Sequence, residues 1–482
     1  MNNEIASTVN TVIRREDMQE VAKSYRHPIP LILGSHSALD AAAGARNYHL
    51  RRIIYTTPER ANIYVQNPIV GRDKPIRDLP ARARDDIIVR NDPKDINKVA
   101  SWNQCILVLD NYRDILKHTD KLRDLECIQI PNRAFSVYVG GEACKEIEDN
   151  FDVPIIGARS LLKIENREEV EENYYWYLEQ AGIPHPEEFL FDVKSDQTGI
   201  RFKTTVERPL VLKVPHKSRR LERGFIFAAN GSDMEEKVES YIKTGIIDAK
   251  DLTVGRAEEY VPGVTANFNF FYSPLYAKED WGELERYLMS AKGISREKAR
   301  MWLANEFMSI DERREATHDG VIRMGAELQL KVNWAKTPYP RTFEVTAHLP
   351  ISLRESLIRK IHPIADMFLE KTMEVDPPGI IGAYCIQTLI TFKELRSSDP
   401  DFKWVKQVGH GLYDVPEGGT LFDHVPKVQD VATRHGGGTN THMGFGAQYS
   451  NAKYLRNMSM GDRIALEIVN ATERKMLHEI VT

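Results

Sequence analysis

The stretch IPLILGSHSALDAAAGARNYHLRRIIY, residues 29–55, carries the clearest fold signal of the chain. The apolar run Ile29–Leu33 is followed by a short polar turn, a small-residue segment at Ala38–Ala45 and a second apolar run at Arg52–Tyr55. This order predicts a strand, turn, helix, strand unit. In an open α/β sheet the turn after the first strand meets a helix N-terminus, where free N–H groups and the helix dipole favour anions. Gly34, Ser35 and His36 lie in that turn.

The sequence after this unit predicts further lobes. Two apolar runs, Cys105–Leu109 and Cys127–Ile130, extend the expected parallel sheet, so we expect a first α/β domain over residues 1–150. Residues 67–100, which precede these two runs, are charged and contain several prolines, which indicates an insertion or a long loop.

The remaining sequence predicts a mixed α+β lobe at residues 151–275 and a C-terminal lobe at residues 276–482. The runs Glu188–Phe191, Gly199–Thr204 and Leu210–Val214 favour strands, as does Ala383–Thr391 further on. Helices are expected at 236–244 and 353–374, and insertions near 277–306 and 393–427. The expected fold class is therefore α/β with α+β lobes.

Composition excludes several classes of protein. The 482 residues carry a formal net charge of −5, which argues against a nucleic-acid binder. The four cysteines are scattered without a CxxC pair, which indicates small buried side chains in a reducing compartment rather than a zinc site. We find neither an apolar run of about 18 residues nor an N-terminal signal core, so we expect a cytoplasmic protein without a membrane partner.

Two motifs could meet a nucleotide. Lys213 lies in the apolar run Leu210–Val214, and a phosphate partner would explain a lysine there; a solvent-facing edge strand would explain it equally well. Glu258, Glu259, Tyr260 and Val261 end a strand-like run, where one carboxylate could meet a ribose hydroxyl. An ordinary charged strand end is the simpler interpretation of this second motif.

The late part of the chain offers a metal pair and a glycine loop. Gln387 and Asp430 fall in two separate strand-like runs, and oxygen ligands on adjacent strands suit Mg²⁺. Their spacing alone favours the simpler interpretation, two ordinary polar residues in half-exposed strands. Residues 434–440 read RHGGGTN, in which glycines allow close backbone approach and Arg434 could grip a phosphate or carboxylate. The nearby His435 and His442 are expected to be ordinary loop histidines.

The order of short motifs along the chain resembles the archaeal PurP-type formaminoimidazolecarboxamide ribonucleotide synthetases, a family of the ATP-grasp superfamily. The resemblance covers nearly the whole chain apart from the three expected insertions. The stretches that carry it are LGSHSALD (33–40), VPIIGARSLL (153–162), AEEYVPG (257–263), FFYSPL (270–275), LRESL (353–357), PPGIIGAYCIQ (377–387), HGGGTN (435–440) and SMGDRIALEI (459–468).

The resemblance implies an ATP-grasp fold with an N-terminal Rossmann-like domain, and a ligase reaction in purine biosynthesis. ATP would phosphorylate formate, and the amino group of aminoimidazole carboxamide ribonucleotide (AICAR) would attack the formyl phosphate to give the formamido nucleotide FAICAR. The implied cofactors are ATP and Mg²⁺, with Mn²⁺ as a possible substitute. Members of the family assemble as oligomers, so the resemblance also implies a homo-oligomer.

The resemblance also implies roles for individual residues. ATP would contact Lys213, Arg223, Gly224 and Glu258 to Val261, and the metal would contact Gln387 and Asp430. The substrate nucleotide would contact Gly34, Ser35, His36, Ala134 and Thr317, with Asp311 nearby. Arg434, Thr439 and Asn440 would line the place where formate and nucleotide meet, and Arg434 and Arg313 are the implied catalytic residues.

Several positions depart from the family pattern. The phosphate-covering loop reads HKSRRLERGF at 216–225, of which only Arg223-Gly224 keeps the glycine-rich pattern. The family's His-Gly-Ser is Asn132-Arg133-Ala134, an asparagine is replaced by Thr317, and a glutamate metal ligand by Asp430. Two alternatives therefore stay open: a related ligase for another carboxylate or amine, and a nucleotide-binding protein without catalysis.

Overall fold

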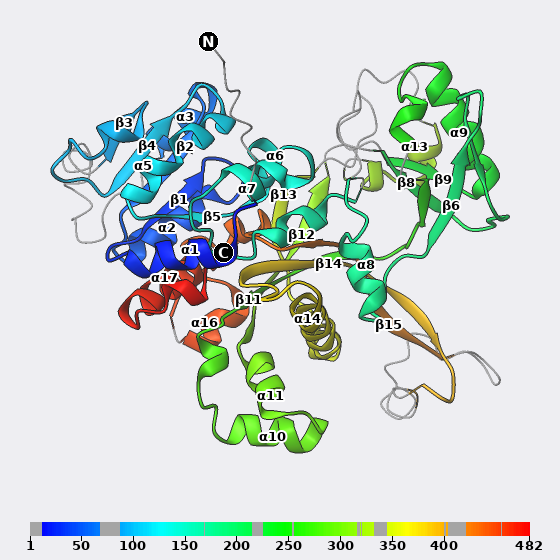
Figure 1. The fold of residues 1–482 in the computed structure, drawn as a ribbon. Coiled ribbons are helices and arrows are strands. Elements are labelled where there is room, and N and C mark those ends of the chain that lie inside the picture. Colours follow the sequence, from blue (N-terminus) through cyan, green and yellow to red (C-terminus); the bar gives the residue numbers. More distant parts are fainter. Residues whose placement is uncertain are drawn as a thin grey trace, which may run out of the picture.

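The computed structural model describes residues 12–67, 87–167, 169–214, 225–252, 255–315, 319, 321–331, 345–399, 402, 421–454 and 456–482. These residues form three five-stranded sheets (Figure 1). The first sheet lies on the left of Figure 1, the second on the right, and the third spans the space between them. The domain boundaries expected at residues 150 and 275 stay predictions.

The first sheet is parallel, with the strand order β3-β4-β2-β1-β5. All residues of β1 and β2 are buried, which is why both strands read as continuous apolar runs. The strand, turn, helix, strand prediction is confirmed by β1, α2 and β2. The strands are β1 (Ile29–Leu33), β2 (Arg52–Thr56), β3 (Ile87–Arg90), β4 (Gln104–Val108) and β5 (Cys127–Ile130).

Helices around the first sheet are short. They are α1 (Arg15–Ser24), α2 (Ala38–Asn47), α3 (Pro58–Gln66), α5 (Thr119–Asp124), α6 (Arg133–Tyr138) and α7 (Lys145–Asn150). The prediction of an insertion over 67–100 is wrong for β3, which pairs with β4 at the sheet edge. The run Ile87–Val89 is short and flanked by charged residues, so its strand signal is weak; residues 68–86 lie outside the described part.

The second sheet is antiparallel, with the order β7-β6-β10-β8-β9. Its strands are β6 (Glu188–Val193), β7 (Ile200–Phe202), β8 (Leu210–Lys213), β9 (Phe225–Ala228) and β10 (Arg256–Glu259). Helix α9 (Gly231–Lys243) begins five residues before the predicted start, because the Asn230 side chain accepts a hydrogen bond from the Asp233 N–H and caps it. Met234 and Val238 of α9 pack against the sheet.

The third sheet is also antiparallel, with the order β13-β12-β11-β14-β15. Its strands are β11 (Val264–Tyr272), β12 (Asn305–Glu315), β13 (Val345–Pro350), β14 (Gly382–Leu395) and β15 (Leu421–Ala432). The 21-residue helix α14 (Glu355–Val375) packs against one face, where Phe268, Ile386 and Val431 share a buried core with Phe368. The opposite face carries Asn267, Asn269 and Gln387.

The expected insertions have distinct structures. Residues 277–306 include the helices α10 (Glu283–Lys292) and α11 (Arg296–Leu303), which project at the bottom of Figure 1. In the insertion expected near 393–427, residues 393–395 belong to β14 and residues 421–427 belong to β15. These two strands pair as far as Leu395 and Leu421. These strands therefore run further than the sequence indicated.

The C-terminal part of the chain returns to the first sheet. Helix α17 (Met460–Glu473) packs on α2, beside the blue helices in Figure 1. A Cβ atom on Gly44 would lie only 2.0 Å from the Gly461 carbonyl carbon, so glycine is needed where the two helices meet. The other α-helices in the described part of the chain are α8 (Tyr174–Gln180), α13 (Ala326–Lys331) and α16 (Gln448–Tyr454).

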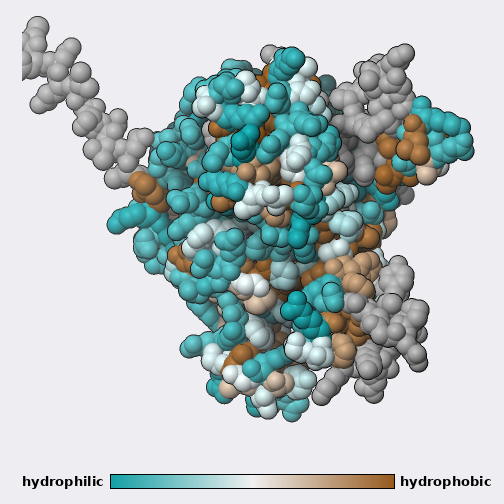
Figure 2. Space-filling view, turned by 90° about the vertical axis from the view of Figure 1, so that its right-hand side faces the viewer, coloured by the Kyte–Doolittle hydropathy of each residue, from teal (hydrophilic) through white to brown (hydrophobic). Residues whose placement is uncertain are grey.

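Surface and cysteine positions bear on the class of protein. Among the described residues, no helix is both long and apolar enough to cross a membrane. The face in Figure 2 is largely hydrophilic, with hydrophobic side chains in small groups. All four cysteines are unpaired and buried, as expected of small core side chains.

Candidate active site

A cavity of about 600 Å³ lies between the second and third sheets and the loops that follow β1 and β5. It gathers residues that are far apart in the sequence. The predicted site residues that line it are Ser35, His36, Ala134, Lys213, Glu258, Glu259, Tyr260, Val261, Arg313, Gln387, Asp430 and Arg434. Gly34, Thr439 and Asn440 do not line it but adjoin residues that do, and Arg223, Gly224 and Thr317 lie outside the described residues.

One end of the cavity is built around a buried carboxylate shared by two cations. Lys213 Nζ lies 2.7 Å from Glu258 Oε2, and Arg167 pairs with the other oxygen of the same carboxylate. The solvent-facing alternative for Lys213 is wrong, because β8 lies between β10 and β9 and the side chain is 19% exposed. Sequence reasoning missed Arg167, since it lies in a loop 91 residues from its partner.

The pKa values at this end follow from burial and charge. Burial lowers the pKa of Lys213, and Glu258 offsets this only in part. Burial alone would raise the pKa of Glu258, but the charges of Lys213 and Arg167 outweigh it and hold that pKa below its ordinary value. The cluster joins two basic side chains to one carboxylate, so its formal charge is +1.

The strand end after Glu258 is held by local contacts. Glu259 Oε2 lies 2.6 Å from Lys427 Nζ, which ties β10 to β15. The Tyr260 N–H donates to the Pro209 carbonyl, while the Tyr260 ring packs edge-on against Phe227 at 5.5 Å. Both aromatic rings face the cavity. This arrangement is a wall for a planar ring system beside the Lys213 cluster.

Strand register brings four polar residues into one row across the third sheet. Asp311 pairs with Asn267, Asn267 with Gln387, and Gln387 with Asp430. Directly opposite residues in antiparallel strands point to the same face, here the cavity face. The Gln387 Oε1 atom is buried and has no hydrogen-bond partner among the described residues. Asp430 is 37% exposed, and its nearest cation is Arg313 at 3.6 Å.

Asp311 is the most strongly held carboxylate of this row. Asn267 Nδ2 donates to it at 2.8 Å, Asn269 Nδ2 at 2.7 Å, and His348 Nδ1 lies 2.7 Å away. Burial opposes its ionisation, but these partners hold its pKa below the ordinary value. The two asparagines and His348 were not predicted, although the alternation of Asn267 and Asn269 with phenylalanines on β11 is a period-two signal for a polar face.

The other end of the cavity has a second carboxylate between two arginines. Glu165 Oε2 lies 2.8 Å from Arg133 Nη1 and 3.0 Å from Arg434 Nη2. His36 lies nearby, and burial together with the charge of Arg434 holds the His36 pKa well below its ordinary value. The imidazole is therefore neutral near pH 7. Sequence reasoning missed Glu165, because its partner Arg434 is 269 residues away.

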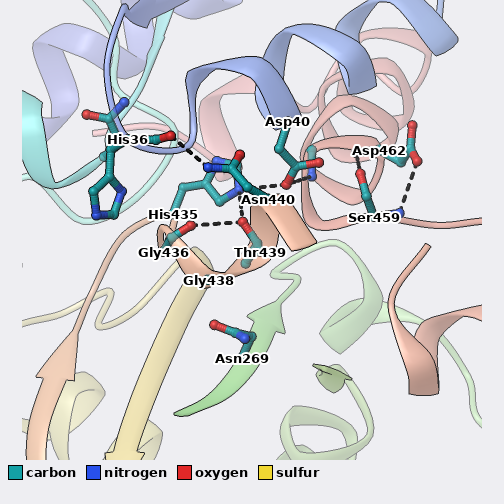
Figure 3. A network of polar contacts seen from close by, with 12 residues as sticks. His36, Asp40, Asn269, His435, Gly436, Gly438, Thr439, Asn440, Ser459 and Asp462 are labelled. Carbon is teal, nitrogen blue, oxygen red and sulfur yellow. Dashed lines mark hydrogen bonds and ion pairs between the residues drawn. The ribbon is translucent and has the colours of Figure 1, made fainter. Parts of the chain in front are cut away.

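The glycine loop packs against these residues more closely than any side chain allows. A Cβ atom on Gly437 would lie 2.6 Å from the His36 ring, and one on Gly438 would lie 2.2 Å from Asp311 Oδ2. Figure 3 shows the loop between Asp40 of α2 and Asn269 of β11. Asn440 Nδ2 donates to the His36 carbonyl at 2.7 Å, which fixes the loop after β1.

His435 anchors the start of this loop. Its Nε2 atom lies 3.0 Å from Asp40 Oδ2 and 2.8 Å from Thr439 Oγ1 (Figure 3). His435 lies in a loop, as predicted, but it is 1% exposed and ties the glycine loop to α2. Thr439 is also buried at this contact, so its side chain holds the loop in place and does not line the cavity.

Comparison with known proteins shows which families and named proteins this chain is similar to. The chain matches the model "Domain of unknown function (DUF1297)" over residues 233–399 and 423–482, and "Protein of unknown function (DUF1246)" over residues 31–189. One relative, from Methanopyrus kandleri, is named 5-formaminoimidazole-4-carboxamide-1-(beta)-D-ribofuranosyl 5'-monophosphate synthetase. It is 26% identical to this chain, over 98% of this chain and 100% of its own length. The protein of the same name from Methanobrevibacter smithii is 28% identical over 78% of this chain and 82% of its own.

A solved structure shares the fold. The crystal structure of an IMP biosynthesis protein PurP from Thermococcus kodakaraensis superimposes with a TM-score of 0.52 and 22% identity, over 94% of this chain and 100% of that one. The parallel first sheet and the two antiparallel sheets around the cavity form the ATP-grasp fold that the motif order implied. The chain is therefore similar, over most of its length, to proteins named 5-formaminoimidazole-4-carboxamide-1-(beta)-D-ribofuranosyl 5'-monophosphate synthetase.

Proposed function

We propose that this protein is an ATP-dependent carbon–nitrogen ligase that formylates AICAR with formate, giving FAICAR, ADP and phosphate. The observation that carries the proposal is that one cavity holds a cationic cluster at each end and a pair of oxygen ligands from adjacent strands. The names of the relatives supply the substrate class. The reaction would serve purine biosynthesis in the cytoplasm.

ATP would occupy the end of the cavity at the second sheet. Lys213 and Arg167 would face its phosphates, because together they exceed the charge of Glu258 by one. The rings of Phe227 and Tyr260 would pack against the adenine. A lysine in an apolar strand beside a triphosphate also explains why burial of this ammonium is tolerated.

The third sheet has the donors that a magnesium ion requires. Gln387 has a buried oxygen without a partner among the described residues, and the Asp430 carboxylate faces it across the strands. No group of three or more His, Cys, Asp or Glu side chains that could hold a metal is found in the described part of the chain. Two oxygen ligands fit Mg²⁺ or Mn²⁺, which share their remaining positions with water and phosphate oxygens. When bound, the ion would neutralise charge on the transferred phosphoryl group.

The chemistry divides into two transfers. A formate oxygen attacks the γ-phosphorus of ATP, the bond to the bridging oxygen breaks, and ADP leaves. The AICAR amino nitrogen then attacks the formyl carbon, the bond from that carbon to the phosphate oxygen breaks, and the amine loses a proton. Arg434 and Arg313 would stabilise the negative charge that develops on the reacting groups during the two transfers. The neutral His36 would accept a hydrogen bond from the nucleotide.

A second candidate is a ligase of the same type for another carboxylate or amine. The observation that favours it is that Arg133 and Ala134, which depart from the family pattern, both line the cavity. Either ligase would act on small molecules and would need no nucleic-acid or membrane partner. We expect a homo-oligomer, as in the family.

The test is the release of ADP by the purified protein with ATP, Mg²⁺, formate and AICAR, omitting each in turn. We expect release that requires all four, together with a formylated nucleotide product. Release that persists with other carboxylates but not with formate would favour the second candidate. ADP binding without turnover under any mixture would overturn both and leave a nucleotide-binding protein.

A further inference from the structure

The two ends of the cavity repeat one electrostatic arrangement. Lys213 and Arg167 share Glu258 at one end, and Arg133 and Arg434 share Glu165 at the other. Each cluster has a surplus of one positive charge. The residues Glu165 and Arg167 are separated by a single residue, so one short segment joins the clusters. A surplus cation at a partly buried site favours an anionic ligand.

The second cluster has unused hydrogen-bonding capacity. Both arginines contact the same oxygen of Glu165, at 2.8 and 3.0 Å. The other oxygen of Glu165 and the Nε atom of Arg434 are buried without a partner among the described residues. Arg434 is 7% exposed. Buried donors of this kind are normally satisfied, so a ligand in the cavity is the natural partner for the Arg434 guanidinium.

Local structure fixes both arginines in place. Arg133 is the first residue of α6, and the side chain of the preceding Asn132 caps this helix and also donates to the Leu33 carbonyl at 3.1 Å. Arg434 lies two residues after the end of β15 and donates from Nη1 to the His435 carbonyl at 3.3 Å. The Arg133 side chain is 32% exposed and faces the cavity, so its remaining donors can reach a ligand.

We propose that Arg133 and Arg434 together hold an oxyanion, either a carboxylate or a phosphoryl group, and that Glu165 positions their guanidinium groups. The planar donors of two arginines match the geometry of both anions. The charge of Asp430 acts on both Arg133 and Lys213, so the Gln387–Asp430 pair lies within reach of both clusters. This assignment rests on the proposed function, because it places the acceptor anion next to the site of phosphoryl transfer.

The test uses inorganic phosphate as the probe, with the protein saturated by ADP and Mg²⁺ so that the Lys213 cluster is occupied. We expect Arg133→Ala to weaken phosphate binding about tenfold in equilibrium dialysis, and Arg133→Lys to restore part of it. Glu165→Gln removes a competing negative charge but keeps an amide oxygen that both arginines can contact, so phosphate binding should tighten, whereas simple structural damage would weaken it. Arg113→Ala is the matched control, since Arg113 pairs with Glu146 on the surface of the same lobe.

Three outcomes would overturn the proposal: no phosphate binding by the unmodified protein, equal binding by the Arg133→Ala and Arg113→Ala variants, or weaker binding by Glu165→Gln. If the protein does not formylate AICAR but phosphate binding still depends on Arg133, the oxyanion site stands and the proposed function fails. If the protein does formylate AICAR, a raised KM for formate in Arg133→Ala identifies the carboxylate as the ligand. A raised KM for AICAR identifies the nucleotide phosphate instead. Unchanged KM values for both would refute the role in catalysis.

Discussion

Replacing Gly438 by alanine should disturb Asp311, a carboxylate that three polar side chains hold in the cavity. The added Cβ atom would lie 2.2 Å from Asp311 Oδ2 and 2.3 Å from its Oδ1 and Cγ atoms. Asp311 cannot move freely, because Asn267, Asn269 and His348 hold it at 2.7–2.8 Å and its side chain is 1% exposed. The alanine therefore has to displace either the glycine loop or this carboxylate.

The magnitude follows from the contacts that must change. Lengthening one hydrogen bond to an ionised group costs about 1.5–3 kcal/mol, and overpacking a buried site costs about 1–3 kcal/mol. For a chain of 482 residues the unfolding entropy is about 1 kcal/mol per kelvin if it unfolds as one unit. We therefore expect Gly438→Ala to lower the melting temperature by about 3 °C or more, and to reduce turnover because Asp311 moves.

Gly436→Ala is the matched control in the same loop. Its Cβ atom would lie 3.4 Å from Asn269 Oδ1, an ordinary contact, and neither glycine has a positive φ that would penalise alanine by itself. The assay is scanning calorimetry of the two variants and the unmodified protein, with turnover measured on the same samples. Equal melting temperatures for both variants would refute the reasoning.

Three further predictions follow from the site and the core. Asp430→Ala and Gln387→Ala should each raise the Mg²⁺ concentration that gives half-maximal turnover at least about tenfold, with unchanged melting temperature; an unaltered Mg²⁺ titration would remove the metal assignment. Lys213→Ala should weaken ATP binding about tenfold in calorimetric titrations, while Glu258 keeps its contact with Arg167 and the fold persists; equal ATP affinity would contradict the ATP end. Burial raises the pKa of Asp366 from its ordinary 3.8 to about 7, so the folded protein retains a proton that the unfolded chain releases between these values, and stability falls as pH rises through that window. Asp366→Asn should therefore stabilise the protein by about 2 kcal/mol more at pH 8 than at pH 5.5; a pH-independent effect in urea unfolding would contradict the assignment.

The fold was predictable where the sequence signal is local. The fully buried strands β1 and β2 read as apolar runs, and α14 as an amphipathic helix. Strand β3 was missed because it has only four residues, which is too short for a clear strand pattern. The strand that it pairs with, β4, comes later in the chain. Packing of α17 on α2 joins residues more than 400 positions apart, and no local pattern encodes it.

Several residues that line the cavity were singled out from the sequence one by one, but their arrangement was not. Lys213, Gln387 and Asp430 stood out as polar side chains in apolar or strand-like runs. That Gln387 and Asp430 face each other depends on strand register, which the sequence does not specify. Glu165 and Arg167 lie in a stretch without periodicity, and their partners are distant in the chain, so only the folded structure reveals the two clusters.

The most direct test of the central claim follows an oxygen atom from formate. The protein is supplied with ATP, Mg²⁺, AICAR and ¹⁸O-labelled formate, and the released phosphate and nucleotide are analysed by mass spectrometry. If ATP activates formate in this cavity, each released phosphate carries one ¹⁸O atom and is matched by one formylated nucleotide. Unlabelled phosphate, or phosphate released without a formylated product, would contradict the account.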